Sequence, residues 1–172
     1  MDRRHFLHGL SCGLGLAVAG CAAPPQSGTR EPAVTQLDEP TVTAFDDWLH
    51  SDVVASATTA TTLVQFGSSA DSHWVIILAD TAQPIDATIS ISRADREPFY
   101  TETVAISADT YAGFRFMAPG AYTVTVSSDT GGGNVAVSDD FIDCNNSRQI
   151  IRLRSDGELS ESYLTEEVAC GV

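Results

Sequence analysis

The chain has 172 residues, of which 23 are acidic and nine are basic, and its formal net charge is −14. This length is sufficient for one domain with a hydrophobic core. Because so negative a chain repels phosphate backbones and anionic headgroups, we exclude nucleic acid as an expected partner and expect no direct adhesion to an acidic lipid surface.

The first 20 residues contain the physical parts of an export signal. Arg3 and Arg4 precede Phe6 and Leu7, and an apolar run over residues 9–19 leads to small residues before Cys21. Paired arginines, a short apolar segment and small residues at the end are typical of a cleaved signal. The run is shorter than the roughly 20 apolar residues that span a bilayer. A cytoplasmic protein with an apolar N-terminal helix is the alternative.

Two motifs in this segment resemble known signals. R-R-x-F-L is similar to the twin-arginine export signal, from which the chain departs at Asp2 and His8. V-A-G-C, which ends at Cys21, resembles the lipobox, whose cysteine becomes the lipid-bearing first residue of the mature protein. The resemblance implies a signal peptide over residues 1–20 and a mature protein anchored to the extracellular face of the cell membrane through Cys21.

Residues 21–39 are predicted to form a flexible tether. Residues 22–37 are rich in Pro, Ser, Gly and Thr and show no apolar period. About 16 residues reach roughly 50 Å when fully extended, so the tether would hold a domain clear of the lipid.

The acidic excess increases when the signal is removed. Asp2, Arg3 and Arg4 leave with it, so 22 acids remain against seven arginines, and the chain contains no lysine. This balance, together with abundant Ala, Thr, Val and Asp, resembles that of proteins from salt-loving archaea. An ordinary acidic secreted protein is the alternative.

Residues 40–172 are predicted to form one domain of short strands, because the apolar period is two rather than 3.6. Residues 45–49 are expected to form a short helical turn, and 128–133, which contain three glycines, a flexible loop. Residues 74–78 are apolar throughout, as in a central strand covered on both faces. The expected strands are 41–45, 74–78, 85–92, 99–107, 114–116, 122–126, 135–142, 149–153 and 159–164.

This spacing of strands and turns is typical of an all-β antiparallel sandwich, here of about 7–9 strands. The segments I-D-A-T-I-S-I, Y-T-E-T-V-A-I and P-G-A-Y-T-V-T-V, followed by two cysteines, resemble the immunoglobulin-like sandwich of small archaeal lipoproteins, and the P-G-x-Y turn is similar to that of prealbumin-like modules. In this turn Tyr122 is expected to bury its ring while its hydroxyl binds the backbone. The resemblance covers residues 74–170 and implies no catalytic residue.

The four cysteines have separate predicted roles. Cys12 leaves with the signal and Cys21 is the lipid site, which leaves Cys144 and Cys170 in an exported chain where disulfides persist. A bond between them would stabilise the domain by roughly 3–4 kcal/mol in the chain-entropy model. A metal site is not favoured, because no C-x-x-C pair occurs.

Residues that could carry chemistry are few. His50 and His73 are expected at the surface or a sheet edge, and no nucleophile-elbow, phosphate-loop or dinucleotide motif occurs. We therefore predict no enzyme activity and no cofactor. Asp139, Asp140 and Asp143 are weak candidates for Ca²⁺, which binds clustered carboxylates. The alternative for these aspartates is a solvated acidic surface.

Two further candidates concern sugars. Asn145 begins an N-x-S sequon, which is a possible glycosylation site beside Cys144. Trp48 is flanked by polar residues and is the candidate for stacking on a glycan, whereas Trp74 begins an apolar strand and is expected in the core.

We therefore expect a lipid-anchored, cell-surface β-sandwich that acts as a non-catalytic binding or structural accessory, with an unknown surface protein or glycan as its partner. The alternatives are a carbohydrate- or Ca²⁺-binding surface module and an accessory subunit of a transporter.

Overall fold

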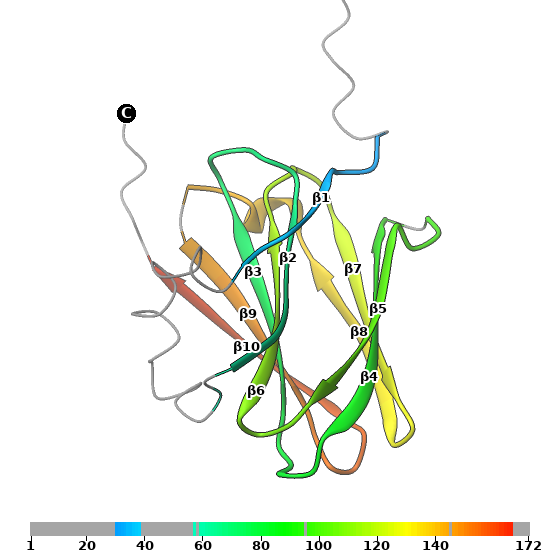
Figure 1. Ribbon diagram of the computed structural model, residues 1–172. Coiled ribbons are helices and arrows are strands. Elements are labelled where there is room, and N and C mark those ends of the chain that lie inside the picture. Colours follow the sequence, from blue (N-terminus) through cyan, green and yellow to red (C-terminus); the bar gives the residue numbers. More distant parts are fainter. Residues whose placement is uncertain (1–29, 39–56, 58, 95, 145, 167–172) are drawn as a thin grey trace, which may run out of the picture.

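The structure, a computed structural model, describes residues 30–38, 57, 59–94, 96–144 and 146–166. These residues form two packed β-sheets, one of six strands in the order β1-β2-β6-β3-β9-β10 and one of four in the order β5-β4-β7-β8 (Figure 1). The strands are β1 (Val34–Gln36), β2 (Thr59–Phe66), β3 (His73–Ala79), β4 (Ile85–Arg93), β5 (Tyr100–Ile106), β6 (Thr110–Phe116), β7 (Tyr122–Ser128), β8 (Gly131–Val137), β9 (Asn146–Leu153) and β10 (Leu159–Glu166).

The all-β, two-layer architecture confirms the predicted class, but the prediction of a purely antiparallel sandwich of 7–9 strands is wrong. The described residues form ten strands, and the larger sheet is mixed. Strand β2 pairs with β6 in parallel, and β3 pairs with β9 in parallel. Apolar alternation shows that a strand has a buried face, but it does not show which strand lies beside it.

The main core lies between the two sheets. In β4, Ala87, Ile89 and Ile91 are fully buried while the residues between them are partly exposed, as the alternation predicts. In the larger sheet the ring of Phe66 is surrounded by other rings. Its centroid lies 5.4 Å from that of Phe99 and 5.2 Å from that of Phe116.

Strand β3 is buried along its whole length, which confirms that residues 74–78 form a central strand covered on both faces. Its inward residues, Val75 and Ile77, belong to the main core. Its outward residues belong to a second apolar cluster, in which Trp74 is buried as predicted. The cluster comprises Ala57, Leu63, Trp74, Ile76, Leu78, Tyr111 and Ile150.

Several predicted boundaries differ from the structure. Residues 34–36, which the sequence assigns to the tether, form β1 and pair with β2. The expected strand 135–142 ends at Val137, and a short 3₁₀ helix, η2 (Asp139–Phe141), follows. The expected strand 41–45 and the helical turn 45–49 lie outside the described residues.

The prediction of a flexible loop at 128–133 is wrong, because its glycines begin β8 and pair with the end of β7. Gly131 has φ +148° and Gly157, in the β9–β10 turn, has φ +83°. A Cβ on Gly131 would lie 2.7 Å from the carbonyl oxygen of Gly157. Glycine is therefore required here because two hairpins from different sheets approach each other closely.

Candidate binding pocket

The P-G-A-Y turn between β6 and β7 has the packing role that the sequence predicts. The ring of Tyr122 is buried, and its hydroxyl donates a hydrogen bond of 2.7 Å to the carbonyl oxygen of Ala118. Gly120 adopts φ +142°, a conformation that L side chains rarely adopt. Tyr122 therefore fixes the turn from one side, and Gly120 leaves the space of a side chain free on it.

Arg93, the last residue of β4, fills the space that Gly120 leaves. A Cβ on Gly120 would collide with the Arg93 guanidinium. Nη2 of Arg93 donates to the carbonyl oxygen of Pro119, and Nη1 donates to that of Arg30 at 2.9 Å. Its Cζ also lies 5.4 Å from the centre of the Tyr122 ring, within the range of a cation–π contact. Two hydrogen bonds and a cation–π contact thus hold this guanidinium in one position.

The turn after β4 places a second arginine beside it. Ala94 has φ +51° and is the one non-glycine residue with positive φ among those described. The N–H of Ala94 donates to the carbonyl oxygen of Ala121 at 3.1 Å, and that of Arg96 donates to the carbonyl oxygen of Arg93 at 3.3 Å. This left-handed residue reverses the chain within the turn and brings Arg96 back toward Arg93.

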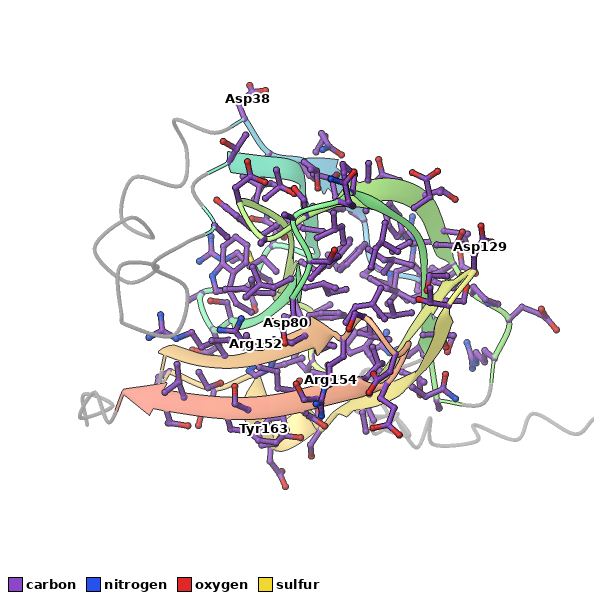
Figure 2. The ribbon with its side chains drawn as sticks, turned by 90° about the horizontal axis from the view of Figure 1, so that it is seen from below. Asp38, Asp80, Asp129, Arg152, Arg154 and Tyr163 are labelled. Atoms are coloured by element: carbon purple, nitrogen blue, oxygen red, sulfur yellow. The ribbon has the colours of Figure 1, made fainter. Side chains whose placement is uncertain are left out.

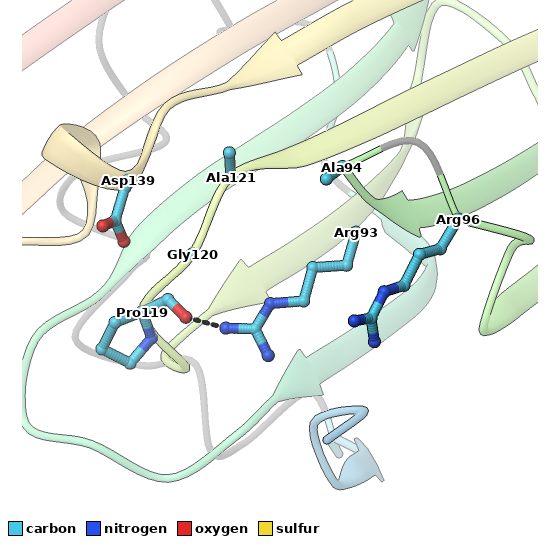
Figure 3. A pocket seen from close by; sticks show the side chains of 7 residues that line it. All are labelled: Arg93, Ala94, Arg96, Pro119, Gly120, Ala121 and Asp139. Carbon is cyan, nitrogen blue, oxygen red and sulfur yellow. Dashed lines mark hydrogen bonds between the residues drawn. The ribbon is translucent and has the colours of Figure 1, made fainter. Parts of the chain in front are cut away.

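These turns surround an open pocket of ≈ 250 Å³ at the end of the sandwich where Arg30 also lies (Figure 3). Both arginine side chains extend in the same direction, and the carboxylate of Asp139 lies beyond Gly120 on the other side. Burial raises the pKa of Tyr122 above its ordinary value of 10.0, although the charge of Arg93 opposes this shift. The pocket is lined by Arg93, Ala94, Arg96, Pro119, Gly120, Ala121 and Asp139.

Asp139 belongs to η2, where the sequence suggested a weak calcium site. Ser138 caps this helix by accepting a hydrogen bond from the N–H of Asp140 at 3.4 Å. Asp139 and Asp140 are exposed, and no three His, Cys, Asp or Glu side chains in the described part of the chain are placed to hold one metal ion. Asp139 therefore contributes to the candidate site as one of the residues that line the pocket.

The expectation that His73 lies at the surface or an edge is wrong, because its side chain is 1% exposed in the interior of the larger sheet. Its Nδ1 lies 2.7 Å from Oγ of Ser147, and its Nε2 lies 3.0 Å from Oε1 of Gln149. The ring also stacks on Phe141 at 5.2 Å. Parallel pairing of β3 with β9 places His73 directly beside Ser147.

Neighbouring acceptors fix the orientation of the Gln149 amide. Its Nε2 donates to the carbonyl oxygen of Ala136 at 2.9 Å and also lies 2.8 Å from Oε1 of Glu161 and 3.0 Å from the hydroxyl of Tyr163. The amide oxygen therefore faces His73, so Nε2 of His73 must carry a proton. Tyr163 lies on β10, which is an edge strand of the larger sheet (Figure 2).

Burial lowers the pKa of His73 to about 4, although the hydrogen bond to Gln149 and the charge of Asp143 oppose this shift. The ring is therefore neutral at pH 7, with Nδ1 as an acceptor. The Ser147 hydroxyl has one proton and lies within reach of both Nδ1 and the carbonyl oxygen of Phe141, at 2.7 and 2.8 Å. The group is a buried, internally bonded network rather than an open site.

Most of the site residues predicted from the sequence lie outside the described residues. These are Arg3, Arg4, Phe6, Leu7, Cys21, Trp48, His50, Asn145 and Cys170. Cys144 follows η2 by three residues, and its bond to Cys170 stays a prediction. The serine of the sequon, Ser147, is 6% exposed, so its hydroxyl is not available on the surface of the folded chain.

Sequence reasoning missed the pocket. The signal that could have found it was present, because two arginines in the turn R-A-D-R stand out in a chain with nine arginines and no lysine. The contact between this turn and the P-G-A-Y turn, 26 residues later, becomes visible only when β4 and β7 pair.

The described part of the chain contains no helix that is long enough and apolar enough to cross a bilayer. No protein-family model and no curated protein matches the chain.

Proposed function

We propose that this protein is a lipid-anchored β-sandwich of the outer cell surface that acts as a non-catalytic binding module, with the pocket between Arg93, Arg96 and Asp139 as its ligand site. One observation carries the proposal. The guanidinium of Arg93 occupies the space that Gly120 leaves without a side chain, and two carbonyl oxygens and an aromatic ring hold it there, at the wall of a pocket that is open to solvent.

This arrangement favours binding over a purely structural role. A guanidinium fixed in advance loses little conformational freedom when a ligand arrives, which improves affinity. The left-handed conformation of Ala94, on the wall of the same pocket, costs of order 1 kcal/mol, and such strain is concentrated at functional sites.

The Ser147–His73 pair supports a non-catalytic assignment. Their separation of 2.7 Å is that of a nucleophile and its base, but both side chains are buried. The serine hydroxyl is also within hydrogen-bonding distance of the Phe141 carbonyl oxygen. A substrate has no access to this pair without opening the sheet.

A carbohydrate-binding surface module is the second candidate, and the mixed lining of the pocket favours it. Arginine N–H groups donate to oxygens of a sugar, and the carboxylate of Asp139 accepts from its hydroxyls. An accessory subunit of a transporter is compatible with the same pocket, and a direct search for the partner separates these candidates.

Export and anchoring are tested by changing the signal. Replacing Arg3 and Arg4 together by lysine is expected to leave precursor in the cytoplasm. Cys21→Ser is expected to release the protein to the medium or to stall its processing. Detergent phase partition and cell fractionation measure both effects, and normal membrane retention of the Cys21→Ser protein would refute the lipid anchor.

Binding is tested by affinity capture of the native protein from solubilised envelope. The control for the pocket variant Arg96→Ala is Arg154→Ala, which removes an exposed arginine from the β9–β10 turn. This turn and the β4–β5 turn, which lines the pocket, lie at opposite ends of the sandwich (Figure 1). We expect a protein or glycan that the wild type and Arg154→Ala retain and Arg96→Ala loses. If all three retain the same material, the pocket is not the binding site.

The acidic surface supports a second proposal, that the protein works in concentrated salt. Repulsion among the carboxylates acts over a Debye length of about 10 Å at 0.1 M salt and about 3 Å at 1 M. We expect the melting temperature of the protein to rise steadily over this range. A rise reproduced by millimolar Ca²⁺ at constant low ionic strength would indicate a bound ion instead, and a flat response to both titrations would refute the halophilic interpretation.

A further inference from the structure

We infer that the outer edge of strand β10 binds an extended, positively charged segment of another protein, which adds to the larger sheet as a further strand. None of the residues that line the pocket belongs to β10, so this surface is independent of the pocket and its ligand. Three features of β10 indicate strand addition, which are its register, its exposed length and its charge.

Strand β10 is an edge of the larger sheet, and among the described residues it pairs only with β9 (Figure 1). Two main-chain hydrogen bonds fix which of its residues bond to β9. The N–H of Arg154 donates to the carbonyl oxygen of Glu158 at 2.9 Å, whereas the N–H of Asp80, which follows β3, donates to that of Leu153 at 3.0 Å. Successive residues of a strand direct their main-chain groups to opposite sides, so every second residue of β10 directs them away from β9. These residues are Leu159, Glu161, Tyr163 and Thr165.

The exposed edge is long. Strand β10 has eight residues and pairs with β9 without a register shift, whereas the edge strands β5 and β8 have seven residues and β1 has three. An open edge is commonly protected by a short strand, a bulge or a proline, and β10 has none of these. The side chains of Glu161, Ser162, Tyr163 and Thr165 are exposed. The outward main-chain groups of β10 are therefore accessible to a partner strand.

The charge of β10 indicates which kind of segment pairs with it. The strand contains two glutamates and no basic residue. Oε1 of Glu161 lies 2.8 Å from Nε2 of Gln149, a neutral amide, which positions this carboxylate without neutralising it. A second copy of the chain would bring the same charges to the edge, and each copy has a net charge of −14, so like charges oppose self-pairing. A cationic side chain opposite Glu161 instead forms a favourable cross-strand pair.

Tyr163 adds an aromatic surface beside Glu161. Both side chains approach the Gln149 amide, at 2.8 and 3.0 Å, so they lie on the same face of β10. The Tyr163 ring also contacts that of Phe141, with centroids 5.5 Å apart, and 52% of Tyr163 is exposed. An added strand places alternate side chains against this face, and a tyrosine ring packs against apolar side chains or against a cation. The partner segment is therefore expected to carry cationic and apolar residues at alternate positions.

The test is a titration of the full chain, purified in detergent, with a short capped peptide in which threonines separate arginine and valine residues. One control peptide has glutamate in place of arginine. The other has the side chains of the arginine peptide but a methyl group on every main-chain nitrogen, so it donates no main-chain hydrogen bond. The exchange of the β10 amide protons with solvent, followed by NMR, is measured at constant ionic strength.

In the free chain, the outward amide protons of Glu161 and Tyr163 are expected to exchange faster than that of Ser162, which donates to β9. The arginine peptide is expected to slow the exchange of both outward protons by about tenfold or more, since a factor of ten corresponds to about 1.4 kcal/mol and one hydrogen bond contributes about that much. The two control peptides are expected to leave these rates unchanged.

Variants of β10 separate main-chain pairing from side-chain contacts. Tyr163→Pro removes an outward N–H but no donor to β9, and proline is tolerated at such edge positions. It is expected to abolish binding of the arginine peptide, whereas Tyr163→Thr, which loses the same ring and keeps the N–H, is expected to retain it in weakened form. Glu161→Gln is expected to lower the affinity by up to about fivefold. Circular dichroism and the melting temperature of each variant verify that it is folded.

Other outcomes overturn the inference. Slow exchange of the outward protons in the free chain would show that the edge is already covered. Equal binding of the methylated peptide would show charge attraction without strand addition, and equal binding of the glutamate peptide would show that charge does not select the partner. A dimer in sedimentation that Tyr163→Pro dissociates would assign the edge to a second copy. Failure of the arginine peptide to bind would reject the edge as a docking surface, while the pocket function is decided separately by the envelope capture.

Discussion

Strands β3 and β4 are interior strands of their sheets, yet they bury their residues differently. Every residue of β3 is buried, while in β4 buried residues alternate with partly exposed or exposed ones. The sequences H-W-V-I-I-L-A and I-D-A-T-I-S-I-S-R follow this difference residue by residue. A continuous apolar run thus indicates burial on both faces of a sheet, whereas strict alternation indicates burial on one.

The outer surfaces of the two strands are held by different forces. On β4, the Thr88 hydroxyl lies 2.8 Å from that of Thr103, and the Ser90 hydroxyl lies 3.1 Å from that of Thr101. On β3, the outward residues Trp74, Ile76 and Leu78 form an apolar cluster with their neighbours. Hydrophobic burial therefore stabilises both faces of β3, and hydroxyl pairs contribute on the outer face of β4.

The largest effect is expected where the two sheets share one interior. Phe66→Ala removes a fully buried ring that contacts four other aromatic rings. We expect a loss of about 3–5 kcal/mol in the free energy of unfolding, measured by chemical denaturation. Phe66→Leu keeps most of the apolar volume and should lose much less. A loss below about 1 kcal/mol for the alanine variant would contradict the described packing.

The second largest effect is expected on the outer face of β3, and it is compared with a substitution on the outer face of β4. Ile76→Ala is expected to cost about 2–4 kcal/mol, because Ile76 is 0% exposed although it points away from the main core. The variant for comparison is Ser90→Ala on the outer face of β4, which is expected to change the free energy of unfolding by about 0.5 kcal/mol or less. Equal costs for the two variants would remove the distinction between β3 and β4.

The histidine at the start of β3 predicts a pH effect. The pKa of His73 is about 4 in the folded chain, whereas the pKa of an exposed histidine is 6.5, so the unfolded state binds the proton first as pH falls. The stabilising contribution of the neutral ring is complete above pH 6.5 and is lost between pH 6.5 and about 4, in total about 3 kcal/mol.

Chemical denaturation of the wild type and His73→Gln at several pH values measures this loss. The difference between the two free energies of unfolding at each pH cancels the contribution of the carboxylates, which both proteins share. His50→Gln is the matched control, and its profile should follow that of the wild type. If the free energy of unfolding of His73→Gln varies with pH as that of the wild type does, His73 is not the titrating group.

The smallest effect concerns the turn beneath the pocket. Tyr122→Phe leaves the Ala118 carbonyl oxygen without the hydroxyl that donates to it and is expected to cost about 0.5–1.5 kcal/mol. Tyr163→Phe removes a hydroxyl from a side chain that is 52% exposed and should cost less. Thermal unfolding of both variants tests the order, and a larger loss in Tyr163→Phe would contradict it.

The local features of this fold were predictable from the amino-acid sequence. The alternation at 85–92 predicted which residues of β4 face inward, the apolar run at 74–78 predicted a strand covered on both faces, and the P-G-A-Y motif predicted the buried ring and bonded hydroxyl of Tyr122. These features depend on the period of apolar side chains and on turn propensity, and both are set by residues that are adjacent in the sequence.

The neighbours of each strand, in contrast, were not predictable from local sequence and are known from the fold. The parallel pairs β2–β6 and β3–β9 join segments that are far apart in the sequence, and the second pair places His73 against Ser147. The glycines predicted to form a loop pair with β7 as the start of β8, and the close approach of Gly157 explains why a side chain does not fit at Gly131. Arg93 reaches the Pro119 carbonyl oxygen only because β4 lies beside β7. The local sequence pattern around a residue carries no information about contacts between chain segments that meet only when the two sheets pack. The pocket is formed by such contacts and was therefore not predicted.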